Sequence, residues 1–115
     1  MDKEQINKLT SEYQSLQEQI QSLSLQKAQL SEQNEEFKIA AAELDKAKGK
    51  VYSAIGGAIV ETTGDEAKKE LKERQESVEM RLNIVNKQYD DAIKKEKSLR
   101  QQIESMIKNE NPNSK

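Results

Sequence analysis

Apolar residues recur at alternating intervals of three and four residues through the first part of this chain. Only Lys27 and Asn34 are polar in the series, and no glycine or proline interrupts it. The positions are Ile6, Leu9, Tyr13, Leu16, Ile20, Leu23, Lys27, Leu30, Asn34, Phe37, Ala41 and Leu44. This spacing is typical of the a and d positions of a coiled coil. It predicts a helix over residues 3–46, which the glycine at position 49 would help to end.

The second half of the chain repeats the same spacing. We call the residues at these a and d positions the seam of each helix. In the second half the seam is Leu71, Gln75, Val78, Leu82, Val85, Tyr89, Ala92, Glu96, Leu99, Ile103 and Met106. Thr63 and Glu66 have the spacing of a capping box at a helix start. The pattern predicts a second helix over residues 65–108 and a frayed tail at 109–115. Two helices of equal length around a short connector predict an antiparallel coiled-coil hairpin, which makes the chain a single, mainly α domain over residues 1–115.

The composition agrees with a narrow seam and excludes several classes of protein. Apolar residues make up 33% of the chain and charged residues 35%, so a large core cannot form. The net charge is -2 without a basic patch, which argues against nucleic acid as a partner. There is no apolar run long enough to span a membrane and no leader-like N-terminus, so we expect a cytoplasmic protein.

The chain also lacks the usual means of catalysis. It contains no histidine and no cysteine, which removes the commonest general base, thiol chemistry and a structural zinc site. No phosphate-binding loop motif occurs, and a two-helix rod offers no desolvated cleft in which carboxylate pKa values would shift. We therefore expect no enzyme activity, no catalytic residues, no metal site and no cofactor.

The stretch KVYSAIGGAIVETTG, residues 50–64, predicts a β-hairpin between the helices. Gly56 and Gly57 suit a two-residue type I′ turn, in which both central residues need positive φ. Folding about this turn leaves apolar side chains on both faces and two open edges, which is an aggregation hazard in an isolated hairpin. We expect the hairpin to pair with other subunits. The alternative is that it folds back as a cap on its own helix ends. The residues expected to carry assembly are Val51, Tyr52, Ile55, Gly56, Gly57, Ile59 and Val60.

The order helix, VYSAIGGAIVETT, helix resembles the prefoldin family, specifically its β-type subunits. The similarity covers nearly the whole chain and includes the acidic-capped helix start DEAKKELKER. It implies a heterohexamer of two α-type and four β-type chains whose hairpins form a common platform. It also implies an ATP-independent holdase that binds unfolded polypeptides and delivers them to a group II chaperonin. The implied partners are an α-type prefoldin subunit, further copies of this chain, unfolded clients and that chaperonin.

The helix ends far from the hairpin are the candidate client site. Unfolded chains expose apolar segments, so their binding surface should be apolar, accessible and deformable, and helix ends open at low cost. The residues of this site are Ile6, Leu9, Tyr13, Leu99, Ile103, Met106 and Ile107. The same residues can instead be ordinary coiled-coil core. The competing function is a coiled-coil scaffold or tether without client binding, although a tether needs only a polar loop at its bend.

Overall fold

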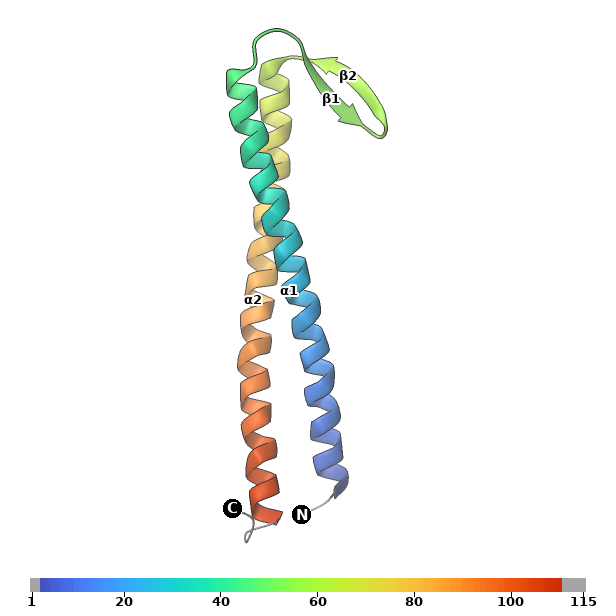
Figure 1. Cartoon of the computed structure of the whole chain (residues 1–115), viewed down its shortest axis with the longest axis vertical. Coiled ribbons are helices and arrows are strands. Elements are labelled where there is room, and N and C mark those ends of the chain that lie inside the picture. The colour runs from blue at the N-terminus through green and yellow to red at the C-terminus, as the bar shows by residue number, and fades with distance from the viewer. Residues whose placement is uncertain (1–2, 111–115) are drawn as a thin grey trace. The chain divides into compact units, whose positions relative to one another are not determined.

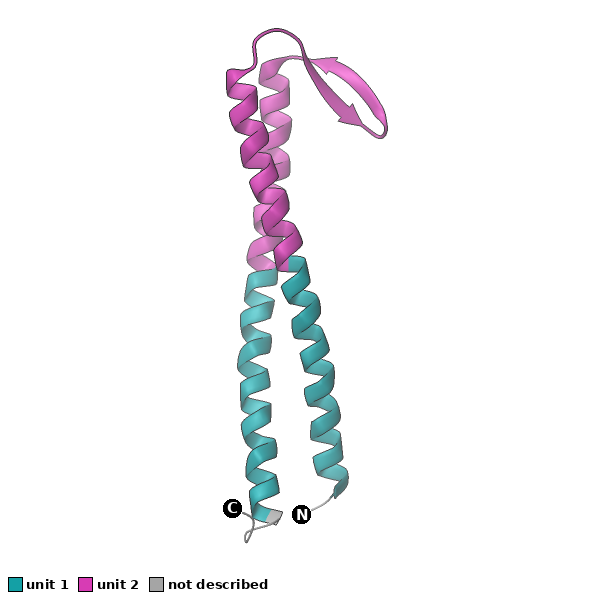
Figure 2. Ribbon diagram, in the orientation of Figure 1, with its two compact units in different colours: residues 1–26, 85–115 teal, residues 27–84 magenta. Residues whose placement is uncertain are grey.

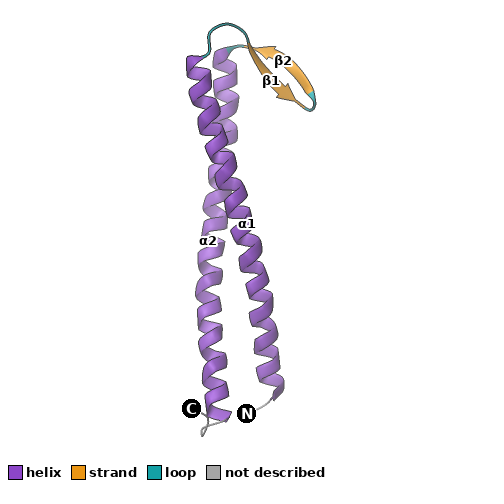
Figure 3. Cartoon of the chain, in the orientation of Figure 1, coloured by secondary structure: helices purple, strands orange, loops and turns teal. Residues whose placement is uncertain are grey.

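The structure of the protein, a computed structural model, describes residues 3–110 and contains two long helices with a β-hairpin between them (Figure 1, Figure 3). Helix α1 spans Lys3–Lys46, strand β1 Val51–Ile55, strand β2 Ala58–Thr62 and helix α2 Gly64–Glu110. The mainly α fold class with an intervening hairpin is therefore confirmed.

The end of α2 differs from the sequence expectation. The helix continues to Glu110, two residues beyond the end expected near residue 108, which is within the one or two residues by which assigned helix ends vary. Residues 109 and 110 are asparagine and glutamate, neither of which prevents helical backbone. The rest of the expected tail, residues 111–115, lies outside the described residues.

Local signals in the sequence explain where the helices stop and start. After Lys46 the amide of Ala47 donates to the Leu44 carbonyl at 3.2 Å, which tightens the last turn of α1. At the start of α2 the amide of Glu66 donates to Thr63 Oγ1 at 3.1 Å, as the capping box predicts. Thr63 thus acts as the N-cap and satisfies one of the free amides of the first turn.

The hairpin has the predicted register. Ile55 pairs with Ala58, Ala54 with Ile59, Ser53 with Val60, Tyr52 with Glu61, and Val51 with Thr62. Gly56 and Gly57 form the turn with φ of 52° and 86°, the left-handed backbone that a type I′ turn requires at both positions. The Gly-Gly pair therefore determines which side chains share a face.

The contacts within the described chain form two compact units, each containing part of both helices (Figure 2). The first unit comprises residues 1–26 and 85–115. Its buried residues come from the two facing seams: Leu16, Leu23, Val85, Ala92, Leu99 and Met106. Tyr13 on α1 contacts Glu96 on α2 in this unit.

The second unit comprises residues 27–84 and contains the hairpin. Val78 is buried, while Phe37, Leu44 and Leu71 are half-buried. Lys68 of α2 lies 3.2 Å from the carboxylate of Asp45 on α1. The last turns of α1 thus lie beside the first turns of α2, as in an antiparallel helix pair.

Burial along α2 follows one position of the heptad. Val78, Val85, Ala92, Leu99 and Met106 are the residues of α2 below a tenth exposed, and each is seven residues after the last. The other seam position holds half-exposed residues such as Leu82, Tyr89 and Ile103. Two helices can therefore cover only a single row of side chains deeply on α2, as the low apolar content requires.

Candidate functional site

The hairpin presents a cluster of exposed apolar side chains. Tyr52 and Ile55 are each 57% exposed, Ile59 is 77% exposed and Val60 is 47% exposed. Val51, the remaining large apolar residue of the predicted assembly set, is half-buried and lies near residues of both helices. Among the described residues the sheet has two strands only, so each strand has one edge without a neighbouring strand.

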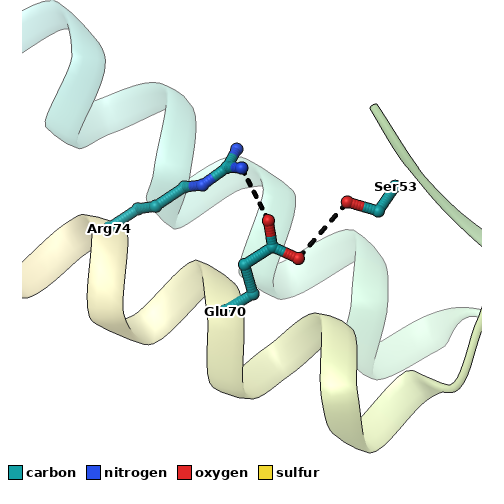
Figure 4. Close-up of polar contacts among 3 residues, drawn as sticks. All are labelled: Ser53, Glu70 and Arg74. Atoms are coloured by element: carbon teal, nitrogen blue, oxygen red, sulfur yellow. Dashed lines mark hydrogen bonds and ion pairs between the residues drawn. The ribbon is translucent and has the colours of Figure 1, made fainter. Parts of the chain in front are cut away.

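One face of the hairpin is attached to α2 by a hydrogen bond that sequence reasoning missed. The Ser53 hydroxyl donates to Glu70 Oε2 at 3.3 Å, and the other carboxylate oxygen of Glu70 lies 2.6 Å from Arg74 Nη2 (Figure 4). Ser53 lies between Val51 and Ile55 on the same face of β1. A hydroxyl at the centre of β1, between Val51 and Ile55, was the available signal for a polar partner nearby.

A groove remains between the hairpin and the helices. It has a volume of about 260 Å³. Its lining residues are Ala40, Leu44, Val51, Tyr52, Ser53, Ala54, Ala67, Glu70, Leu71 and Arg74. The hairpin thus contacts its own helices without closing on them. The alternative expectation is a hairpin folded back as a cap on its own helix ends. Of the strand residues, only Val51, Ser53 and Thr62 are half-buried as a cap would require, and the others are exposed.

The second candidate surface lies in the first unit, where the helix ends farthest from the hairpin in sequence meet. Leu99 and Met106 are buried in the seam, and Ile6, Leu9, Tyr13 and Ile103 are half-buried. Ile107 is 52% exposed, as its position off the seam predicts. The structure therefore places six of the predicted client residues along the helix contact and one outside it.

A groove runs beside this part of the helix contact. Its volume is about 650 Å³. The apolar residues that line it are Leu9, Leu16 and Leu99. Its polar lining consists of Ser11, Glu12, Ser15, Gln19, Lys95, Ser98 and Gln102, which sequence reasoning did not single out. One acid and one base in the lining, Glu12 and Lys95, leave the groove without net charge.

Tyr13 and Glu96 form a polar contact within the same helix pair. The Tyr13 hydroxyl donates to Glu96 Oε1 at 2.8 Å and accepts from Gln17 Nε2 at 3.2 Å. Arg100 Nη1 lies 3.7 Å from the same Glu96 oxygen. The hydrogen bond to Glu96 raises the pKa of Tyr13 above its ordinary value, because ionising the phenol would break the bond and place two negative charges together.

Two further features are absent from residues 3–110. That part of the chain brings together no group of three or more aspartate, glutamate, histidine or cysteine side chains able to hold a metal ion. Neither helix, within these residues, has an apolar stretch long enough to cross a membrane.

Comparison with known proteins gives consistent matches over nearly the whole chain. A family model described as "Prefoldin subunit" matches residues 7–110. The β subunit of prefoldin from Pyrococcus furiosus is 33% identical over 106 residues, which cover 90% of this chain and 91% of the relative. The β subunit from Methanosarcina mazei is 30% identical over 105 residues, with 90% of each chain covered.

A solved structure shows the same fold. The crystal structure of the prefoldin β subunit from Thermococcus strain KS-1 superposes with a TM-score of 0.82 at 35% sequence identity. The superposition covers 89% of this chain and 91% of that one.

Proposed function

Since this chain belongs to the prefoldin family as a β-type subunit, we propose that it is one of four β-type chains in a hexamer with two α-type chains. The whole chain would act as one prefoldin β-type domain in the cytoplasm. The observation that carries the proposal is the hairpin, whose apolar side chains Tyr52, Ile55 and Ile59 are more than half exposed on a sheet with open edges. Strands from other subunits would cover these side chains and satisfy the edge amides.

The helices would then bind clients at the ends far from the hairpins. Ile107 offers an apolar side chain that is exposed without any rearrangement. Leu99 and Met106 become available only when the helices separate there, which is the region where helix ends open at low cost. The uncharged groove beside Leu9 and Leu99 supports binding of unfolded segments rather than of a charged ligand. Delivery of the client to a group II chaperonin follows from the family resemblance, and no ATP would be used.

Assembly is tested by co-expressing this chain with an α-type subunit and measuring the complex by native mass spectrometry. We expect a six-chain complex with four copies of this chain. Ile59→Lys should prevent its formation, because it places a charge on the most exposed of the large apolar residues of the hairpin. The matched control is Ile39→Lys, which changes an isoleucine that is 63% exposed on α1. A monomer or homodimer of the wild-type chain in the presence of its partner would instead favour a scaffold or tether.

Holdase activity is tested on the same complex with a chemically unfolded reporter enzyme diluted into buffer without ATP. We expect the complex to suppress light scattering from the aggregating reporter. Removing residues 1–10 and 99–115 should abolish this suppression and leave the six-chain mass, reduced only by the deletions. A truncated complex that protects the reporter as well as the full one would contradict client binding at the helix ends.

A further inference from the structure

The two connectors that join the hairpin to the helices differ in length and in how tightly their backbone is held. Residues 47–50 separate α1 from β1 and include Gly49 with φ of 101°. Thr63 alone separates β2 from α2, and it is fixed on the helix side by the amides of Glu66 and Ala67, which donate to its hydroxyl and carbonyl oxygens. The direction of the hairpin relative to α2 is therefore set at Thr63.

Ser53 and Glu70 are placed to hold that direction. Val60 precedes Thr63 by three residues and Glu70 follows it by seven. At the usual rise of a strand and a helix, both positions are roughly 10 Å along their elements from Thr63. Ser53 is the cross-strand partner of Val60, and its hydroxyl donates to Glu70. This hydrogen bond (Figure 4) thus closes a triangle whose apex is Thr63.

The other contacts of the hairpin do not perform this task. The groove of about 260 Å³ between the hairpin and the helices is lined by apolar side chains from both sides, among them Val51, Leu44 and Leu71. Apolar contacts are not directional, so they do not fix an angle. Glu70, by contrast, is held on both oxygens. Arg74, one helical turn further along α2, binds the oxygen that Ser53 does not use. Glu70 is therefore oriented toward Ser53 by its own helix.

We propose that Glu70 is a positioning residue that fixes, through Ser53, the angle at which the hairpin leaves α2. This inference rests on the proposed function, in which hairpins join the subunits. Strand pairing between chains requires edges that meet in a defined direction, and a hairpin already held in that direction loses less conformational freedom on assembly. Ser53 and Arg74 act through Glu70, and none of the three has to touch another subunit.

The angle is measured on the isolated full-length chain. Because the chain has no cysteine, Ala58→Cys on the hairpin and Glu79→Cys on α2 give two unique sites for spin labels. Both positions are exposed. We expect one narrow distribution of distances between the labels in the otherwise unchanged chain. Ser53→Ala should broaden it, while Ser53→Thr, which keeps the hydroxyl, should not. Glu70→Ala should broaden it equally, and combining it with Ser53→Ala should add nothing further.

The consequence for assembly is measured with the unlabelled variants and the α-type partner. Loss of one hydrogen bond is expected to weaken assembly roughly two- to tenfold in Ser53→Ala, whereas Ser53→Thr assembles like the wild type. A distance distribution that Ser53→Ala leaves unchanged would overturn the positioning role even if the hexamer forms. A broadened distribution with unchanged assembly would overturn its importance for subunit joining. Failure of the wild type to assemble would refute the proposed function alone, because the label distances do not depend on a partner.

Discussion

Tyr13 on α1 and Glu96 on α2 are joined by a hydrogen bond of 2.8 Å across the helix contact of the first unit. Both residues occupy seam positions at which a coiled coil ordinarily places apolar side chains. The side chain of Glu96 is only 15% exposed, and Arg100 lies 3.7 Å from the oxygen that Tyr13 binds. A polar pair of this kind favours one axial alignment of the helices, because sliding either helix by one turn would separate the phenol from the carboxylate.

The Tyr13 phenol should ionise at a higher pH than an ordinary tyrosine. Its hydrogen bond to Glu96 raises the pKa above 10.0, and partial burial and the charge of Glu96 act in the same direction. Because the folded-state pKa lies above the unfolded one, the pair stabilises the fold fully below the unfolded pKa. That contribution is lost as the pH rises through the folded pKa. The difference in tyrosinate absorbance between wild type and Tyr13→Phe gives the titration of this residue alone.

Glu96→Gln is the control for the cause of that shift. It removes the charge while keeping an oxygen that can accept the phenol hydrogen, so the pKa of Tyr13 should move back toward its ordinary value. An unchanged pKa in this variant would assign the shift to the retained hydrogen bond and to burial rather than to the negative charge of Glu96.

Leu99→Ala should destabilise the isolated chain. Leu99 is 9% exposed and packs in the seam, so we expect the free energy of unfolding to fall by about 2 kcal/mol, the low end for leucine truncation because the surrounding contact is narrow. Leu25→Ala, at a leucine that is 61% exposed, should change it by less than about 0.5 kcal/mol. Urea unfolding followed by circular dichroism measures both, and equal effects would argue against a seam role for Leu99.

Ile107→Ser should weaken capture of an unfolded reporter by the assembled complex. Covering the exposed half of this side chain is worth about 1 kcal/mol, so we expect each β-type subunit to bind the reporter about fivefold more weakly. Ile84→Ser is the matched control, since Ile84 is 53% exposed against 52% for Ile107 but belongs to the second unit. Both variants should form the same six-chain complex. Equal losses of capture would show that exposed isoleucines matter wherever they lie.

Gly57→Ala should destabilise the hairpin through its backbone alone. A methyl group at this position would meet no atom within 4 Å, but φ is 86°. An L-residue there costs about 1–2 kcal/mol. Gly64→Ala is the comparison, because Gly64 is helical without positive φ and is equally uncrowded, so it should be neutral or stabilising. Cross-strand NMR contacts between Ala54 and Ile59 report the hairpin, and their survival in Gly57→Ala would contradict the turn assignment.

The elements themselves could be predicted because their signals are local. Any short window of the three-four spacing between Ile6 and Leu44 is enough to predict helix. Gly56 and Gly57 locate the turn and therefore determine the strand register. Thr63 marks the start of α2 for the same reason. Each of these signals needs only the chemistry of neighbouring residues.

The contacts between elements could not be predicted in the same way. The bond from Tyr13 to Glu96 depends on the axial alignment of two helices to a fraction of a turn. The bond from Ser53 to Glu70 depends on the angle at which the hairpin leaves the helix. Seam spacing and hairpin register do not determine either quantity. The predicted roles of individual hairpin and helix-end residues in binding therefore remain predictions.

The seven-residue spacing of Val78, Val85, Ala92, Leu99 and Met106 makes the length of this molecule adjustable in fixed increments. Removing or adding one heptad in each helix would keep every remaining seam residue on the same side, whereas a change of three or four residues would exchange the deeply buried row for its half-exposed neighbours. Insertion or removal of whole heptads therefore changes the length of both helices without altering the residues at either end.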